Sequence, residues 1–486
     1  MAQSSVGSGS SVEGTVLPEV DAPKVSLLDS IFGEPQPRPV ERRRAPRAAS
    51  PVETPRVEPA RAMSTRLENF VPAAPKSLED AGLTETEVED LILKFLFRRG
   101  VQSGRDIAEQ LRLPFGILQA MFQGLKTSQR IVIVRNSSVS DYEYSITNKG
   151  IEAAKQCNER STYFGAAPVP FADYVAAVGA QSMTRTRITL PQVQAALSDL
   201  SVPTPLCIRI GKALVEARAM FIYGAPGNGK TSIAERLTAA YGDTIWIPRA
   251  IDCDGEIIRV YDPCVHNALP MSQIGDDEKL RQIDHRWVCI TRPTVVVGGE
   301  LTMEHLEVQP NRALGILEAP LQIKSNCGTL VIDDFGRQRI SVDQLLNRWI
   351  VPLERRYDYL SLPSGKKLQA PFDQLVVFST NLDPKGLVDE AFLRRIPYKI
   401  DVRGPSEIEF RQLFNESCVK MGIQPDETVL EHLIETYFRS MDRHFRYCHV
   451  RDILAQVRHH CDFCGVPLEL KVEYIDEAAE NYFGAA

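Results

Sequence analysis

The sequence has no apolar run that approaches the ~20 residues needed to cross a bilayer, and its first residues form no apolar signal-peptide core. It also lacks a strong basic excess, because 56 Lys and Arg oppose 63 Asp and Glu for a formal net charge of -7. These absences argue against a membrane span and against a dedicated nucleic-acid binder. The 10 cysteines are scattered, as is typical of reduced thiols, so we expect a cytoplasmic protein.

Length and composition indicate several modules, since 486 residues predict two or three domains. Residues 1–78 are rich in Pro, Ala, Ser, Glu and Arg and have almost no aromatic side chains. Such a segment buries too little apolar surface to offset the entropy of ordering. We therefore expect residues 1–78 to be a disordered tail.

Residues 79–160 have the pattern of a small α+β domain. Thr84 and Glu87 form a capping box at the start of a helical apolar face that ends at Gly100. Further helices are predicted from Ser103 and over 115–125, and 131–134 and 142–146 alternate as a hairpin. Three helices followed by a two-stranded wing resemble a winged-helix domain.

The third helix of this module is a poor clamp for phosphates. Its exposed positions offer Gln119 and Gln123, and basic residues stand only at Lys126 and Arg130. The module therefore favours docking of a protein client, with nucleic acid as the alternative. The prolines that follow predict a partly ordered linker over residues 161–199.

The most informative stretch is a buried strand, 221–223, that leads directly into a glycine-rich turn. Such a turn presents backbone amides and the positive end of the next helix to phosphates. Lys230 would reach the β- and γ-phosphates, and Thr231 would offer its hydroxyl to Mg²⁺. The predicted nucleotide-binding residues are Gly224, Ala225, Pro226, Gly227, Asn228, Gly229, Lys230, Thr231 and Ser232.

Acidic and amide side chains follow two further apolar strands. Asp333 and Asp334 come after the run 329–332, and Asn381 comes after 375–380. Asp333 is expected to hold Mg²⁺ and Asp334 to polarise the attacking water. Asn381 would orient that water without adding negative charge.

Three arginines complete the candidate set. Arg394 and Arg395 end a short predicted helix, where a surface charge pair is the alternative interpretation. Arg451 lies in the first turn of a later helix, where it opposes the helix dipole and thus indicates a bound anion.

Taken in order, these residues resemble the motifs of the AAA+ ATPases over about residues 200–486. The resemblance places Walker A on Gly224, Gly229, Lys230 and Thr231, Walker B on Asp333 and Asp334, sensor 1 on Asn381, the arginine finger on Arg394 or Arg395, and sensor 2 on Arg451. Arg395 is favoured as the finger because it precedes the apolar Ile396. The segment 317–328 resembles the MoxR-type and enhancer-dependent (helix-2-insert) groups.

The resemblance implies an α/β fold with a doubly wound parallel-sheet P-loop core over 200–402 and a helical lid over 403–486. Apolar spacing predicts lid helices over 408–421, 428–438, 450–463 and 472–483. The segment 287–300 resembles a hairpin insertion. AAA+ proteins usually carry Glu where this chain has Asp334, so a slow ATPase or a nucleotide switch is an open alternative.

The predicted function is therefore that of a Mg²⁺-dependent ATPase that assembles as a homo-oligomer, a hexamer or similar ring. The family implies a remodeller of a protein client recruited by the amino-terminal region. The alternative is an ATP-gated regulator or loader that binds nucleic acid through the winged helix.

Overall fold

The computed structural model describes residues 70–138, 141–242, 244–311 and 316–484. All of them belong to a single unit of the chain, Val57–Ala486. The disorder predicted for residues 1–69 lies outside the described residues. Among the described residues, no helix is both long and apolar enough to cross a membrane.

Residues 70–78 are not part of a disordered tail, which corrects the predicted boundary. The ring of Phe70 lies edge-on against Trp287 at a centroid distance of 5.6 Å. The amide of Ala74 donates to the carbonyl of Gln282 at 2.8 Å. This proline-rich stretch is ordered by a distant segment, so its local composition does not reveal its packing.

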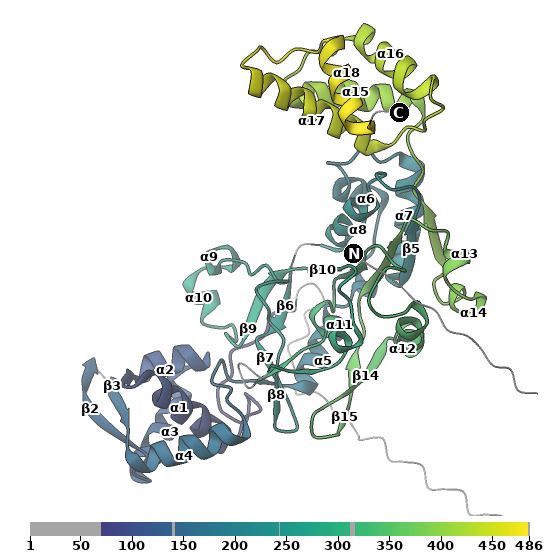
Figure 1. The fold of residues 1–486 in the computed structure, drawn as a ribbon. Helices are drawn as coiled ribbons and strands as arrows, with labels where there is room; N and C mark the ends of the chain where they lie inside the picture. The colour runs from purple at the N-terminus through teal and green to yellow at the C-terminus, as the bar shows by residue number, and fades with distance from the viewer. Residues whose placement is uncertain (1–69, 139–140, 243, 312–315, 485–486) are drawn as a thin grey trace, which may run out of the picture. The chain divides into compact units, whose positions relative to one another are not determined.

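The amino-terminal module has the helices and the hairpin that the sequence predicts (Figure 1). Its first helix begins with the predicted capping box, in which Thr84 N donates to Glu87 at 2.7 Å and Glu87 N donates to Thr84 at 3.3 Å. Strand β3 pairs antiparallel with both β1 and β2. The elements are α1 (Glu85–Arg99), β1 (Gln102–Ser103), α2 (Gly104–Leu111), α3 (Phe115–Thr127), β2 (Ile131–Ser138), β3 (Asp141–Ile146) and α4 (Asn148–Arg160).

The segment predicted to be a partly ordered linker, residues 161–199, contains β4 (Val169–Pro170), α5 (Phe171–Ala180) and α6 (Leu190–Ala196). Tyr174 of α5 is buried, and its hydroxyl accepts a hydrogen bond from Asn326 at 2.7 Å. The prolines stand at helix starts, with Pro170 as the N-cap of α5 and Pro191 in the first turn of α6. Proline favours such positions, so it marks helix beginnings here.

The core sheet contains only parallel pairs, in the order β10 (Thr294–Val297), β13 (Thr329–Ile332), β16 (Leu375–Thr380), β5 (Ala219–Tyr223) and β17 (Tyr398–Asp401). The predicted α/β fold with a parallel sheet is confirmed. The segment 287–300 is not a hairpin, because β9 (Trp287–Thr291) pairs with β6 (Thr244–Pro248) and β10 joins the core sheet.

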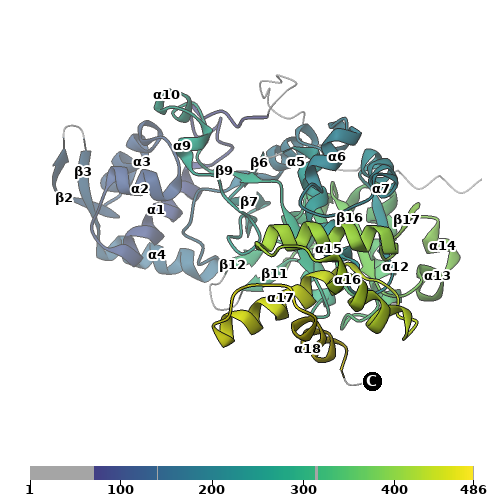
Figure 2. The ribbon, with the colours of Figure 1, turned by 90° about the horizontal axis from the view of Figure 1, so that it is seen from above.

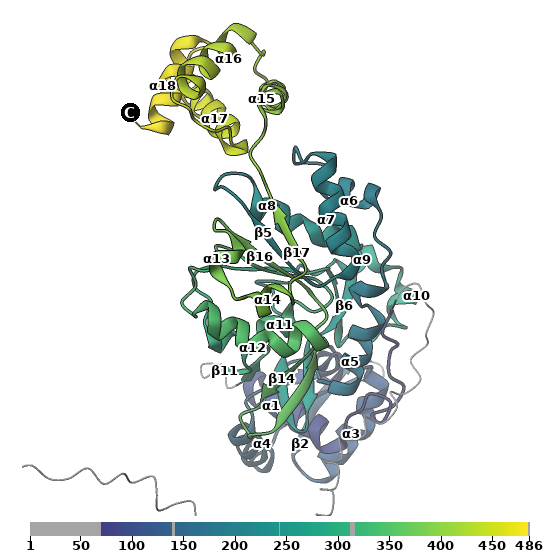
Figure 3. The same cartoon turned by 90° about the vertical axis from the view of Figure 1, so that its right-hand side faces the viewer.

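Helices cover both faces of this sheet (Figure 3). Helices α6, α7 (Thr204–Glu216) and α8 (Lys230–Arg236) bury apolar side chains against one face. Helices α12 (Val342–Arg355) and α14 (Glu390–Leu393) bury theirs, including Trp349, against the other. Successive residues of a strand point to opposite faces, so β5 contributes Ile222 to the first cluster and Phe221 to the second.

A second sheet has the order β11 (Gln309–Asn311), β12 (Ile316–Glu318), β8 (Glu256–Arg259), β7 (Ala250–Cys253) and β4. Its residues contribute to two apolar clusters, since Ala250 lies in that of the amino-terminal module and Ile251 packs with Tyr174. The remaining elements are α9 (Met271–Ile274), α10 (Asp277–Leu280), α11 (Leu321–Lys324), α13 (Pro384–Leu387) and the antiparallel pair β14 (Tyr357–Ser361) and β15 (Lys367–Pro371).

The carboxyl-terminal residues form a helical bundle of α15 (Glu407–Met421), α16 (Glu427–Ile434), α17 (Tyr447–Cys464) and α18 (Val472–Phe483), seen from above in Figure 2. The four helices predicted there are confirmed. Gly422 and Gly465 end α15 and α17 in the left-handed conformation, with φ of 76° and 65°. The bundle core contains Phe410, Phe414 and Phe438.

Candidate functional site

The glycine-rich turn links the end of β5 to the start of α8, and two of its glycines are required sterically. Gly224 has φ of 141°, and a Cβ there would lie 2.4 Å from the carbonyl oxygen of Val402. Gly227 has φ of 82°, and a Cβ there would lie 2.3 Å from Sγ of Cys448. A larger residue at either position would therefore be strained and would require the neighbouring atom to move.

Lys230 is buried at the centre of the site and makes three hydrogen bonds. Its Nζ donates to the carbonyls of Gly224 at 3.1 Å and Ala225 at 3.0 Å, and to Oδ1 of Asn381 at 2.6 Å. Burial lowers the pKa of Lys230, and the charges of Asp333 and Asp334 oppose that shift. The ammonium group is thus held between the turn and the end of β16.

Thr231 and Asp333 present oxygen atoms side by side. The Thr231 hydroxyl donates to Oδ2 of Asp333 at 2.8 Å, which joins the start of α8 to the end of β13. A hydroxyl and a carboxylate are hard oxygen donors, the kind that Mg²⁺ accepts while it keeps its other positions for water and phosphate. The donor set therefore fits Mg²⁺.

Asp334 has an unusual backbone, with φ of 47°. Gln338 holds this turn, since its Nε2 donates to the carbonyls of Asp333 at 2.8 Å and Asp334 at 3.1 Å. Asn381 Nδ2 donates to Oδ1 of Asp334 at 3.3 Å. A left-handed aspartate costs conformational energy, and such outliers are concentrated at functional sites.

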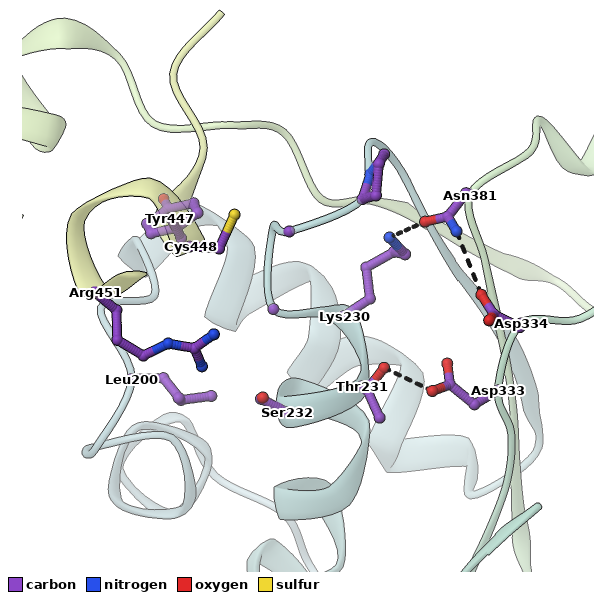
Figure 4. A pocket seen from close by; sticks show the side chains of 13 residues that line it. Leu200, Lys230, Thr231, Ser232, Asp333, Asp334, Asn381, Tyr447, Cys448 and Arg451 are labelled. Carbon is purple, nitrogen blue, oxygen red and sulfur yellow. Dashed lines mark hydrogen bonds between the residues drawn. The ribbon is translucent and has the colours of Figure 1, made fainter. Parts of the chain in front are cut away.

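A cavity of about 440 Å³, within the range of small-molecule sites, is bounded by these groups and by the start of α17 (Figure 4). Pattern analysis missed Leu200, Tyr447 and Cys448, which reach the cavity through folding alone. Of the predicted nucleotide-binding residues, Gly224, Ala225 and Asn228 do not line it. The lining residues are Leu200, Pro226, Gly227, Gly229, Lys230, Thr231, Ser232, Asp333, Asp334, Asn381, Tyr447, Cys448 and Arg451.

Two predicted residues occupy specific places around the cavity. Arg451 lines it from α17, with its side chain 75% exposed and paired with Asp452 at 2.8 Å. The Asn228 side chain is buried instead, and its Nδ2 donates to the carbonyl of Val402 at 3.0 Å. Asn228 therefore ties the turn to the end of β17.

The structure does not bring Arg394 or Arg395 to this cavity. Arg395 pairs with Glu354 of α12 at 2.6 Å. Arg394 is 77% exposed and pairs with Glu390 one helical turn away at 3.3 Å. Neither arginine is among the residues that line the cavity of its own chain.

A family described as a domain of unknown function, DUF8689, matches residues 406–481, the helical bundle. No curated protein matches the chain.

Among solved structures, the RuvB Holliday junction branch migration motor of Thermotoga maritima is similar at 14% identity, with a TM-score of 0.35 over 59% of this chain and 71% of that chain. A point mutant of the same RuvB gives 13% identity and a TM-score of 0.33 over 62% of this chain and 72% of that chain.

Proposed function

We propose that this chain binds ATP with Mg²⁺ and hydrolyses it as a member of the AAA+ ATPases. The observation that carries the proposal is the meeting of Lys230, Thr231, Asp333, Asp334 and Asn381 at one cavity. These residues follow β5, β13 and β16, which are neighbours in the parallel sheet. Ligands of open α/β sheets bind at the carboxyl ends of the strands, where this cavity lies.

The nucleotide's phosphates would lie on the turn that ends at Gly229 and on the first residues of α8. Lys230 would exchange its carbonyl partners for phosphate oxygens, because a charged acceptor makes the stronger hydrogen bond. Thr231 and Asp333 would hold Mg²⁺, which would supply positive charge at the phosphate oxygens when bound. Leu200 and Tyr447 offer apolar surface for the base on the far side of the cavity.

Asp334 would act as general base, and Asn381 would position the attacking water beside it. The hydrogen bond from Asn381 to Asp334 supports this assignment, because it orients the carboxylate. Aspartate is one methylene shorter than the family's glutamate. We therefore expect turnover at the slow end of the family range, since a displacement of about 1 Å can cost ~100-fold in rate.

The assembly proposed for this ATPase is a homo-oligomeric ring, with residues 200–402 as the core and 403–486 as the lid. Arg394 and Arg395 lie away from the cavity of their own chain, which is compatible with a role at a neighbour's site. The exposed Arg394 is the better placed of the two, because Arg395 already pairs with Glu354.

Residues 79–160 are proposed to be a winged-helix module that recruits a protein client. Arg130 pairs with Glu89 at 2.9 Å and Arg135 with Glu143 at 2.8 Å, so carboxylates of the module neutralise these cations. Phosphate backbones need unpaired cations, and this pairing therefore favours a protein partner over DNA.

Steady-state ATP hydrolysis, measured across protein concentration, tests the proposal. We expect a specific rate that rises with concentration, because the shared sites form only on assembly, and no turnover or nucleotide binding in Lys230→Ala. Full nucleotide affinity in Lys230→Ala would contradict the assignment of the turn. Salt-sensitive binding to generic duplex DNA would replace the protein client with nucleic acid.

A further inference from the structure

Arg446 lies against the glycine-rich turn, and neither pattern nor spacing identified it as a site residue. It is the N-cap of α17, directly before Tyr447 and Cys448, which line the cavity. The amide of Cys448 donates to the carbonyl of Gly227 at 3.0 Å. A Cβ built on Gly227 would lie 3.6 Å from Cδ of Arg446, so the arginine stem runs along the tip of the turn.

Among the described residues, no carboxylate pairs with the guanidinium of Arg446, although the residue is half-buried. Of the arginines nearby, Arg451 pairs with Asp452 at 2.8 Å, whereas the guanidinium of Arg443 lies 3.7 Å from the ring centroid of Phe483 and its buried Nη1 has no hydrogen-bond partner among the described residues. A partly buried cation without a counter-charge is unfavourable. It becomes favourable when an anion binds beside it.

Lys230 holds a second cation at the same turn. Its Nζ donates to the carbonyls of Gly224 at 3.1 Å and Ala225 at 3.0 Å, and the stem of Arg446 lies against Gly227. Two cations from different parts of the fold therefore approach the turn. An anion placed between them would relieve their mutual repulsion.

We infer that Arg446 binds the phosphate chain of the nucleotide from the side of the helical bundle, together with Lys230 on the turn. The inference rests on the proposed function, because it needs a nucleotide in this cavity. It assigns a second phosphate-binding arginine to the start of α17, distinct from Arg451, which lies five residues further along the chain. Binding of phosphate would then draw the start of α17 onto the turn at Gly227.

The test measures binding of Mg²⁺–ADP and of adenosine to the full chain by titration calorimetry at several salt concentrations. The variants are Arg446→Ala, Arg446→Lys and Lys230→Ala, with Arg458→Ala as a matched control. Arg458 belongs to the same helix, but its side chain is 55% exposed and pairs with Asp462 at 3.8 Å.

We expect Arg446→Ala to weaken Mg²⁺–ADP binding by about tenfold or more, as for loss of a charged hydrogen bond. The salt dependence of Mg²⁺–ADP binding should become shallower in Arg446→Ala. Arg446→Lys should keep the wild-type salt dependence, and Arg458→Ala should stay close to the wild-type affinity. Adenosine binding should not change, because adenosine carries no phosphate.

Two results would overturn the inference alone: unchanged Mg²⁺–ADP affinity in Arg446→Ala while Lys230→Ala loses it, or a loss that is equal for adenosine and leaves the salt dependence unaltered. The second result would mean that Arg446 only shapes the bundle. If the wild-type chain binds no nucleotide at all, the proposed function fails and the inference fails with it.

Discussion

At the scale of single residues, Gly227 shows how one position links the turn to the bundle. Its positive φ and its contact with Cys448 are independent reasons for glycine. The first belongs to the turn itself and was predictable from the glycine-rich pattern. The second comes from a residue in the distant carboxyl-terminal bundle, and no local pattern indicates it.

Gly227→Ala is therefore expected to destabilise the protein by more than the strained φ alone, which costs about 1 kcal/mol. The added methyl overlaps Sγ of Cys448, and overpacking adds roughly 1–3 kcal/mol. Urea unfolding of the full chain measures the difference.

Gly365→Ala is the matched control, because Gly365 has a similar φ of 85° and nothing within 4 Å of the added Cβ. Cys448→Ala in the Gly227→Ala background should recover the part of the lost unfolding free energy that is due to the overlap. A double-mutant cycle measures this part. Equal losses of unfolding free energy in Gly227→Ala and Gly365→Ala would mean that the bundle does not pack against the turn.

At the scale of elements, α17 delivers most of what the bundle contributes to the site. Arg446, Tyr447, Cys448 and Arg451 all stand at its start, whereas His449 points into the bundle core. The ring of His449 packs against those of Phe438, Tyr482 and Phe483. The position of the helix start thus depends on a buried imidazole.

Burial and the charges of Arg446 and Arg443 lower the pKa of His449 to about 4. The folded state favours the neutral ring, so the stabilisation is complete above the unfolded pKa of about 6.5 and is lost as pH falls toward 4. We expect the melting temperature of the wild-type chain to fall as the pH is lowered through this window.

Calorimetry of His449→Phe checks the assignment. Because the phenylalanine ring cannot titrate, the melting temperature of this variant should depend less on pH over that window. His459→Gln serves as the control, because His459 lies exposed on the same helix. A pH dependence identical in wild type and His449→Phe would contradict a role for the buried imidazole.

At the scale of the whole molecule, the parallel sheet places the site and leaves Arg394 and Arg395 outside it. The ends of β5, β13 and β16 meet at one edge because these strands are neighbours and run the same way. A finger that acts within its own chain would have to reach this edge. The proposal instead requires a second copy to complete each site.

Mixing subunits tests this requirement. Asp334→Ala removes the proposed base, and the double variant Arg394→Ala, Arg395→Ala removes the proposed finger, so each alone should lack turnover. A mixture should recover part of the wild-type rate, because some interfaces combine an intact Asp334 with an intact finger from the neighbour.

A mixture of Lys230→Ala with Asp334→Ala provides the control, since both changes act on the same site and no interface regains a complete set. Recovery in this control as well would point to subunit stabilisation instead of shared sites. Absence of recovery in the first mixture would count against a finger supplied by a neighbour.

Local sequence rules were sufficient to predict the features that short stretches of sequence determine. The turn after β5, the acidic pair after β13 and the capping box at Thr84 follow from glycine conformations, strand hydrophobicity and caps that involve only nearby residues. The helices of the bundle were found for the same reason, because apolar periodicity and terminal glycines are local signals.

Only the tertiary structure decided the features that depend on distant partners. Within residues 161–199, Tyr174 accepts a hydrogen bond from the distant Asn326. Strand β10 pairs in parallel with β13 and so belongs to the core sheet. Arg446 and Cys448 meet Gly227 in the same way. The sequence by itself therefore determined which groups are proposed to bind phosphate and magnesium. Long-range packing decided which side chains surround them, since the free energy of such contacts comes from residues far apart in the chain.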